Sequence, residues 1–321
     1  MTEALTFEGV SRTFRTRGET VQAVTDLSFT VESGETVCLL GPNGAGKTTT
    51  VKMASTLLAA STGRITIAGF DADRDARAAR ARLGLALGGE RGFYMRSSAL
   101  SNLRFFARIQ GVARRDVDAR VQNALDTVRL SDVANRPVEQ LSKGMKQRLH
   151  IARAIVHRPA LLILDEPSSG LDIESAYELR ALICHLRDAG AGILFTTHSM
   201  TDAEMCADRL LVVARGQLLA HGTAEEISRH AAFERISTLR VKRLGSETAG
   251  PLAFLRERAA VTIREGESSV SIDVFWRREE DIALHASAVS ALAGDSEIWT
   301  RKPTLEELYL AITSSPPGVE P

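Results

Sequence analysis

The run GPNGAGKT at residues 41–48, directly after the apolar segment Thr36–Leu40, decides the fold of this chain. Its spacing, G-x-x-x-x-G-K-T, is typical of a loop that binds phosphate between a strand and a helix. Gly44 and Gly46 leave room for backbone N–H groups to approach phosphate oxygens closely. The helix expected at residues 48–59 would direct the positive end of its dipole at the anion. A glycine-rich turn without a ligand is the alternative, and the strand and helix around the loop argue against it.

Two side chains at the end of this loop would act on the phosphates and their cation. Lys47 would place a positive charge beside the β- and γ-phosphates, and the Thr48 hydroxyl would be a ligand of Mg²⁺. The loop therefore predicts a site for a nucleotide together with a magnesium ion. The residues expected to bind the nucleotide here are Gly41, Pro42, Asn43, Gly44, Ala45, Gly46, Lys47, Thr48 and Thr49.

A second apolar strand, in the segment LLILDEP at residues 161–167, ends in two acids, Asp165 and Glu166. A buried charge without a partner is costly, and a bound cation removes that cost. Asp165 would support Mg²⁺ mainly through its water shell. Glu166 would then be free to polarise an attacking water as a general base. A solvated junction between strand and loop is the alternative when the two acids are taken alone, but beside a phosphate loop they favour nucleotide hydrolysis.

Short apolar strands alternate with helical stretches over the N-terminal two thirds of the chain, which predicts a mainly parallel sheet covered on both faces. From Ser97 to His157 apolar residues recur at helical spacing instead, so this block is expected to be helical. After about Gly222 the pattern predicts a small α+β domain, with one helix at residues 281–292 and another opened by a capping box of Thr304 and Glu307.

These patterns predict the domain organisation of the chain. The expected parts are an ATPase-type domain at 1–225 with a helical subdomain at about 95–157, a linker at 226–235, an α+β accessory domain at 236–313 and a disordered tail at 314–321.

The composition excludes several classes of protein. In 321 residues, Lys and Arg together number 40, as do Asp and Glu, which argues against a strongly basic surface for nucleic acid. The apolar runs are about five residues long, whereas a membrane span needs about 20. No secretory signal is predicted. Cys38, Cys184 and Cys206 lack metal-binding spacing, which predicts reduced thiols in a cytosolic protein.

The segment LSKGMKQR at residues 141–148 resembles the LSGGQ signature of the ABC ATPase family. Leu141, Ser142 and Gly144 match the signature, whereas a lysine replaces one glycine and a methionine replaces the glutamine. The segment SGLD at residues 169–172 resembles the D-loop of that family, and TTH at 196–198 resembles its switch-histidine loop. Together with the phosphate loop and the acid pair, these motifs follow the family order over residues 3–225.

The resemblance implies the fold, the ligands and the roles of several residues. The fold would be an α/β P-loop NTPase of the ABC type, with an N-terminal antiparallel β part and a helical subdomain beside the parallel core. The ligands would be ATP and Mg²⁺, with Phe14 stacking on adenine and Lys47, Glu166 and His198 acting in hydrolysis. Ser142 and Gly144 would face the phosphate loop of a second copy, which implies a head-to-tail dimer.

One departure from the family pattern concerns the loop after the strand expected at residues 83–87. Relatives carry a glutamine there, whereas this chain reads GGERGFY at residues 88–94. Glu90 is the nearest substitute and would meet Mg²⁺ or its water as an acid. Residues 91–94 would face a membrane partner, since this loop links the nucleotide site to the permease in relatives.

The C-terminal segment KPTLEELYLAIT at residues 302–313 resembles the closing segment of bacterial drug-exporter ATPases, the daunorubicin-resistance-like group. This predicts a subunit that powers export through a separate transmembrane permease, from the cytoplasmic face of the membrane. Two alternatives are a non-transport ABC ATPase acting on ribosomes or nucleic acid, and a P-loop kinase of a small molecule. The sequence does not identify the cargo.

Overall fold

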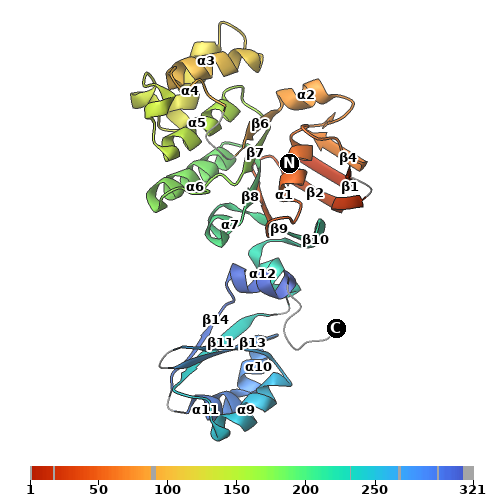
Figure 1. The fold of residues 1–321 in the computed structure, drawn as a ribbon, viewed down its shortest axis with the longest axis vertical. Coiled ribbons are helices and arrows are strands. Elements are labelled where there is room, and N and C mark those ends of the chain that lie inside the picture. Colours follow the sequence, from red (N-terminus) through yellow and green to blue (C-terminus); the bar gives the residue numbers. More distant parts are fainter. Residues whose placement is uncertain are drawn as a thin grey trace. The chain divides into compact units, whose positions relative to one another are not determined.

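The computed structural model describes residues 2–16, 19–87, 92–231, 233–266, 269–294 and 296–313. The chain divides into two units, residues 1–219 and 220–321, shown in Figure 1. Glu90, for which the sequence predicted a role at Mg²⁺, lies outside the described residues, as does the segment 314–321, which was predicted to be disordered.

The strand before the phosphate loop, β3 (Thr36–Leu40), lies inside a six-stranded sheet of order β10-β9-β3-β8-β7-β6. It pairs in parallel with β8 (Gly192–Thr197) and β9 (Arg209–Ala214). Every residue of β3 and β8 is buried, because both faces of the sheet are covered. The remaining strands are β6 (Leu83–Ala86), β7 (Leu161–Asp165) and β10 (Gln217–Gly222). The predicted parallel core is confirmed, and the loops after β3, β7 and β8 leave it at one edge.

An antiparallel sheet of order β2-β1-β4-β5 covers one side of this core. Its strands are β1 (Glu3–Thr16), β2 (Glu19–Glu32), β4 (Thr62–Ile67) and β5 (Phe70–Asp71). Helix α1 (Lys47–Ala54) contacts β7 as well as β2 and β4, so it packs between the two sheets. Buried residues of both sheets and of α1 form one hydrophobic core.

Helix α1 is shorter than the predicted helix at residues 48–59. It ends at Ala54, and Thr56 has a positive φ of 58° that no helix continues. The N–H groups of Leu57 and Leu58 both donate to the carbonyl oxygen of Lys52, at 2.9 and 3.1 Å, and this closes the end of the helix.

A group of helices, α3 (Ala99–Ile109), α4 (Val117–Thr127) and α5 (Lys143–Ile155), lies at one end of the first unit (Figure 1). Its interior contains apolar residues that recur at helical spacing in the sequence, which confirms the predicted helical block. Helix α2 (Ala76–Ala81) precedes β6. Helices α6 (Ile173–Asp188) and α7 (Met200–Cys206) contact each other, and α7 packs on β3 and β8.

The second unit contains an antiparallel sheet of order β12-β13-β11-β14. Strand β13 lies between β11 and β12, which are joined through α9, so the unit has the split β-α-β arrangement of ferredoxin-like folds. One face packs on helices through Leu239, Ile272 and Trp276, whose indole N–H donates to Ser237 at 2.8 Å. The elements are β11 (Arg235–Val241), α9 (Ser246–Arg256), β12 (Ala260–Glu265), β13 (Val270–Trp276), α10 (Glu279–Leu284), α11 (Ala286–Ala293) and β14 (Ile298–Arg301).

The single helix predicted at residues 281–292 is wrong, because α10 and α11 are separate helices that meet at His285. The backbone of His285 leaves the helical region, with φ −114° and ψ 12°. Its ring Nδ1 lies 2.8 Å from the carbonyl oxygen of Asp281, and the ring packs on Trp276. A side chain that bonds its own backbone offers the chain an alternative to a continuous helix.

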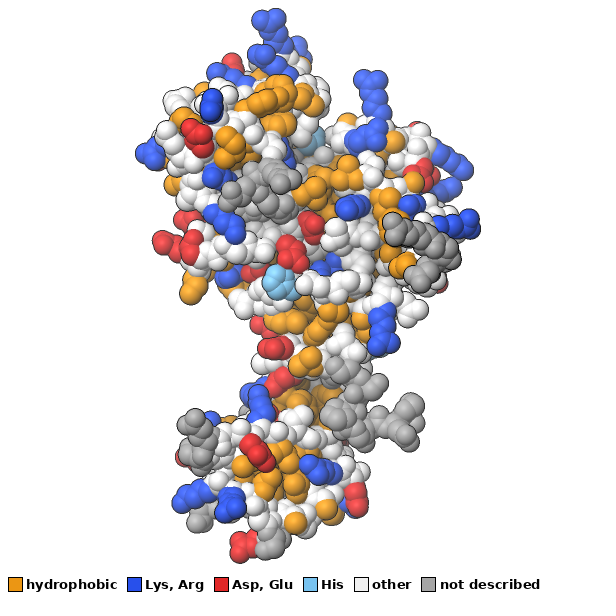
Figure 2. Space-filling view, in the orientation of Figure 1, with side chains coloured by type: hydrophobic (Ala, Val, Ile, Leu, Met, Phe, Trp, Pro, Cys, Tyr) orange, Lys and Arg blue, Asp and Glu red, His pale blue; other side chains and the backbone are white. Residues whose placement is uncertain are grey.

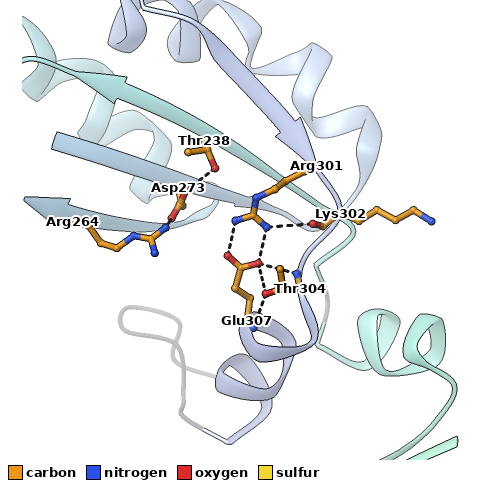
Figure 3. Close-up of polar contacts among 7 residues, drawn as sticks. All are labelled: Thr238, Arg264, Asp273, Arg301, Lys302, Thr304 and Glu307. Atoms are coloured by element: carbon orange, nitrogen blue, oxygen red, sulfur yellow. Dashed lines mark hydrogen bonds and ion pairs between the residues drawn. The ribbon is translucent and has the colours of Figure 1, made fainter. Parts of the chain in front are cut away.

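The last helix, α12 (Leu305–Thr313), is fixed to β14 by a polar cluster (Figure 3). Arg301 donates two hydrogen bonds to the Glu307 carboxylate, at 2.6 and 2.7 Å. The Glu307 carboxylate also accepts from the N–H of Thr304 at 2.8 Å, while the Thr304 hydroxyl accepts from the N–H of Glu307 at 3.3 Å. The predicted capping box is therefore confirmed. Helix α12 also contacts α8 (Ala224–His230). In the sheet that contains β14, the buried Asp273 accepts hydrogen bonds from Thr238 and Arg264.

Replacing Glu307 with alanine is expected to loosen α12 selectively. Burial alone would raise the pKa of Glu307, but the bonds from Arg301 and Thr304 outweigh it and lower that pKa. A lowered pKa means that the stabilisation is present at neutral pH and is lost as the pH falls through the pKa of the folded state. Amide hydrogen exchange in α12 should therefore rise in Glu307→Ala at neutral pH, and also in the unaltered chain on acidification. The exposed neighbour Glu306, changed to alanine, should leave exchange in α12 nearly unchanged.

Candidate functional site

The phosphate loop has the backbone that its glycines permit. Gly46 precedes α1 with φ 101°, and a Cβ atom there would lie 2.6 Å from the carbonyl oxygen of Ala23. Gly44 has φ 82°, which is again a conformation that favours glycine. The N–H of Gly216 donates to the carbonyl oxygen of Ala45 at 3.0 Å and so fixes the middle of the loop. The loop is thus a tight turn at the N-terminus of a helix, a suitable receptor for phosphate.

The Lys47 ammonium lies inside this loop. It donates to the carbonyl oxygens of Gly41 and Pro42, at 2.6 and 3.1 Å, and the residue is only 6% exposed. Burial lowers the pKa of Lys47, while the nearby charges of Glu166 and Asp165 act in the opposite direction. A desolvated ammonium surrounded by backbone carbonyls is poised for an anion that enters the loop.

A cavity of about 370 Å³ opens over the loop. Phe14, the residue expected to stack on adenine, is not among the described residues that line it. Phe14 lies opposite Val21 in the β1–β2 pair and carries the Arg12 guanidinium 4.7 Å above its ring, whereas Val21 itself lines the cavity. The lining residues are Val21, Gln22, Ala23, Pro42, Asn43, Gly44, Gly46, Lys47, Thr48, Thr49, Glu166, Arg215 and Gly216.

A neighbouring cavity of about 590 Å³ brings Thr48 together with Asp165 and Glu166. No group of three or more His, Cys, Asp and Glu side chains that could hold a metal ion occurs among the residues that the structure describes. Mg²⁺ in a nucleotide site takes one or two protein oxygens and keeps water and phosphate as its other ligands. Thr48 and Asp165 offer two such oxygens at the same cavity.

Glu166 and His198 form a close pair at the edge of the sheet. The ring Nδ1 of His198 lies 2.8 Å from Oε2 of Glu166. The Glu166 N–H donates to the carbonyl and hydroxyl oxygens of Thr196, at 3.1 and 3.0 Å, and the Thr196 hydroxyl donates to Asp165 at 2.6 Å. Glu166 has a positive φ of 47°, a conformation that costs a non-glycine residue roughly 1–2 kcal/mol. The neighbouring loops hold it there, so the predicted base and the predicted switch histidine meet.

The segment that resembles the signature begins helix α5. The Ser142 hydroxyl caps this helix by accepting from the N–H of Met145 at 3.2 Å, and a Cβ atom on Gly144 would lie 2.5 Å from the Ser175 hydroxyl. Neither Ser142 nor Gly144 is among the described residues that line the two cavities. Lys143 does line the larger one.

In the sequence, Lys143 stands only as a departure from the signature. In the structure its ammonium donates to the carbonyl oxygen of Gly170 at 2.8 Å, so it links the start of α5 to the segment at residues 169–172. Gln147, one helical turn further along α5, also lines the cavity with Thr48. The pairing of Lys143 with a backbone carbonyl 27 residues away had no signal in the sequence.

A sequence profile of the ABC transporter family matches residues 24–169 of this chain. The ABC transporter ATP-binding protein NatA of Bacillus subtilis (strain 168) is 36% identical over 240 residues, which cover 75% of this chain and 98% of that protein. The chain belongs to the family of ABC transporter ATP-binding proteins. The predicted ATPase family and its fold are thus confirmed.

Two further proteins are similar to this ABC ATPase over most of its length. The daunorubicin resistance ATP-binding protein DrrA3 of Streptomyces coeruleorubidus is 33% identical over 310 residues, 97% of this chain and 96% of that protein. A solved structure of an ATP-binding subunit of an ABC transporter is 30% identical, with a TM-score of 0.62, and the match covers 70% of this chain and 92% of that one.

Figure 2 shows acidic, basic and histidine side chains side by side on one face of the first unit. In the described ranges no helix has the length and apolar character needed to cross a membrane.

Proposed function

We propose that this chain is the ATP-hydrolysing subunit of an exporter, and that two copies bind two ATP molecules between them. The observation that carries the proposal is the meeting of Thr48, Asp165 and Glu166 at one cavity beside the phosphate loop. A P-loop kinase would need the same loop, but it would have no use for the segments at residues 142–144 and 169–172, which resemble the signature and the D-loop.

The residues of the site have distinct roles in this proposal. The N–H groups of the loop and the Lys47 ammonium bind the β- and γ-phosphates, while Thr48 and Asp165 would hold Mg²⁺, which neutralises charge on the phosphates when bound. Glu166 accepts a proton from the attacking water. His198 Nδ1, 2.8 Å from Oε2 of Glu166, holds that carboxylate in place and would contact the γ-phosphate of bound ATP.

The second copy supplies the signature in this proposal. Ser142 and Gly144 are not among the described residues that line the two cavities over the loop, yet the capped start of α5 has the geometry that binds phosphate elsewhere. A head-to-tail arrangement would bring Ser142 of one copy to the phosphates held by its mate. Binding of ATP would then close the dimer and hydrolysis would open it again. The free-energy difference between the closed and open dimers would drive the attached permease.

A separate transmembrane permease completes the proposed exporter at the cytoplasmic face of a membrane. Exposed apolar side chains suited to such a partner lie on the helical part of the first unit, namely Tyr94, Phe105 and Ile109. The rings of Tyr94 and Phe105 meet edge to face at 5.2 Å, so they form one surface. Export is supported by the likeness to a daunorubicin resistance protein over 97% of this chain, rather than action on ribosomes or nucleic acid.

A mixing experiment tests the shared site. Ser142→Asp keeps a residue that caps helices but sets a negative charge against the phosphates of the mate. Lys47→Ala disables the phosphate loop. Each variant alone should be nearly inactive, whereas an equimolar mixture should recover about a quarter of the unaltered turnover, because half the dimers are mixed and each has one intact site. Ser142→Asn is the neutral control.

Turnover of the mixture that does not exceed the sum of the two separate variants would contradict a site shared between copies. It would mean instead that Ser142 acts within its own chain.

A further inference from the structure

Asp202 lies in the first turn of α7 and is 4% exposed. Its carboxylate accepts hydrogen bonds from three side chains on three different elements. Arg180 on α6 donates through Nε at 2.8 Å, Thr197 at the end of β8 donates at 3.4 Å, and Ser168 in the loop after β7 donates as well. The backbone N–H of Asp202 donates to the Ser199 hydroxyl at 3.3 Å. A buried carboxylate with a full set of donors holds its neighbours in one arrangement.

The elements that meet at Asp202 are those that present Glu166 and His198. Ser168 follows Glu166 by two residues, and Thr197 directly precedes His198. The same turn continues through Ser199, whose N–H donates to the Thr197 hydroxyl at 2.9 Å. One carboxylate therefore joins the loop of the general base to the loop of the switch histidine.

We infer that Asp202 is a positioning residue that sets the distance between Glu166 and His198 by holding Ser168 and Thr197 together. This inference rests on the hydrolytic roles proposed for Glu166 and His198. Glu166 has a backbone conformation that is unfavourable outside this context, so it depends on anchors on both sides. Thr196 provides one anchor through the Glu166 N–H, and the bond from Ser168 to Asp202 provides the other.

The Arg180 side chain fixes the orientation of the Asp202 carboxylate through its Nε at 2.8 Å. The Arg180 and Asp202 side chains are 15% and 5% exposed, so each charge is largely removed from water and depends on the other. A second arginine–aspartate pair joins α6 to the loop after α7 in the same way. Arg187 donates to Asp208 at 3.0 Å, but Asp208 also accepts from the N–H of Thr36 and contacts neither catalytic loop. Asp208 is therefore a control for the loss of an arginine–aspartate pair, here one whose side chains are 26% and 41% exposed, without a hydrogen bond to Ser168 or Thr197.

Steady-state ATP hydrolysis by the full chain tests this inference. In Ser168→Ala, which leaves the Arg180–Asp202 pair intact, and in Asp202→Asn, kcat should fall about 10- to 100-fold, as for other residues that orient a catalytic group. The KM for ATP should stay within about twofold, since the phosphate loop is not touched. Asp202→Glu should recover part of the lost kcat. Asp208→Asn should leave kcat unchanged even if it lowers the melting temperature.

The outcomes separate this inference from the proposed function. If Ser168→Ala keeps the unaltered kcat while Glu166→Gln is inactive, Asp202 has only a structural role and the inference is wrong, although the proposed function stands. If Glu166→Gln itself hydrolyses ATP normally, the proposed hydrolytic role of Glu166 is wrong, and the inference about Asp202 is wrong with it. If Asp202→Asn does not fold, Ser168→Ala decides, because it removes a single hydroxyl from a partly exposed loop.

Discussion

The Glu166→Gln chain is expected to hydrolyse ATP about 10²- to 10⁴-fold more slowly than the unaltered chain, the usual contribution of a general base. An amide has nearly the shape of the carboxylate, so it can still lie near His198, but it accepts no proton from water. The affinity for ATP should hardly change, because the loop N–H groups and Lys47 bind the phosphates without help from Glu166.

Release of phosphate and binding of ATP, measured on the same preparation, check this expectation. Glu174→Gln is a suitable control, because Glu174 is exposed at the start of α6 and takes no part in the site. Rapid hydrolysis by Glu166→Gln would mean that Glu166 is not the general base and that another group accepts the proton.

The second large effect is expected in Lys47→Ala, whose affinity for ATP should fall about 10- to 100-fold. A hydrogen bond to a charged group contributes roughly 1.5–3 kcal/mol, and each 1.4 kcal/mol is a factor of ten in the dissociation constant. The reason lies in the position of the ammonium, which is surrounded by carbonyl oxygens of the loop and is almost fully buried. Such a charge interacts strongly with an anion because little water screens it.

The pH dependence of ATP affinity follows from the same burial. Because burial lowers the pKa of Lys47, its charge is lost at a lower pH than that of an ordinary lysine. Affinity for ATP should therefore decline as the pH rises through that lowered pKa, and Lys47→Ala should not show the decline. Calorimetric titration with ATP at several pH values measures both, with the exposed Lys242→Ala as the control. An affinity in Lys47→Ala equal to that of the unaltered chain would argue against the phosphate-loop assignment.

The phosphate loop and the sheet around it could be predicted from the sequence because their signals are local. Residues 36–48 combine an apolar strand, a glycine-rich loop and a helix start within a few residues. The strand that ends in Asp165 and Glu166 carries its own signal in the same way. Parallel strands place their carboxyl ends at one edge, so two local motifs were enough to predict one site.

The parts that could not be predicted depend on contacts between distant segments. Asp202 and Ser168 are 34 residues apart, and a serine in a loop carries no sign of the buried carboxylate that it meets. Lys143 likewise donates to a backbone carbonyl, which any residue could offer. The break between α10 and α11 at His285 depends on a ring that packs on Trp276 in another element. Tertiary contacts override helical periodicity in such places.

We propose that the phosphates of one ATP molecule are bound by two copies of the chain. The most direct measurement is the mass in solution of Glu166→Gln, with and without Mg²⁺ and ATP. We predict a monomer without nucleotide and a dimer with it, and no dimer when Ser142→Asp is added to the same chain. A mass that stays that of the monomer at saturating Mg²⁺ and ATP would contradict the claim.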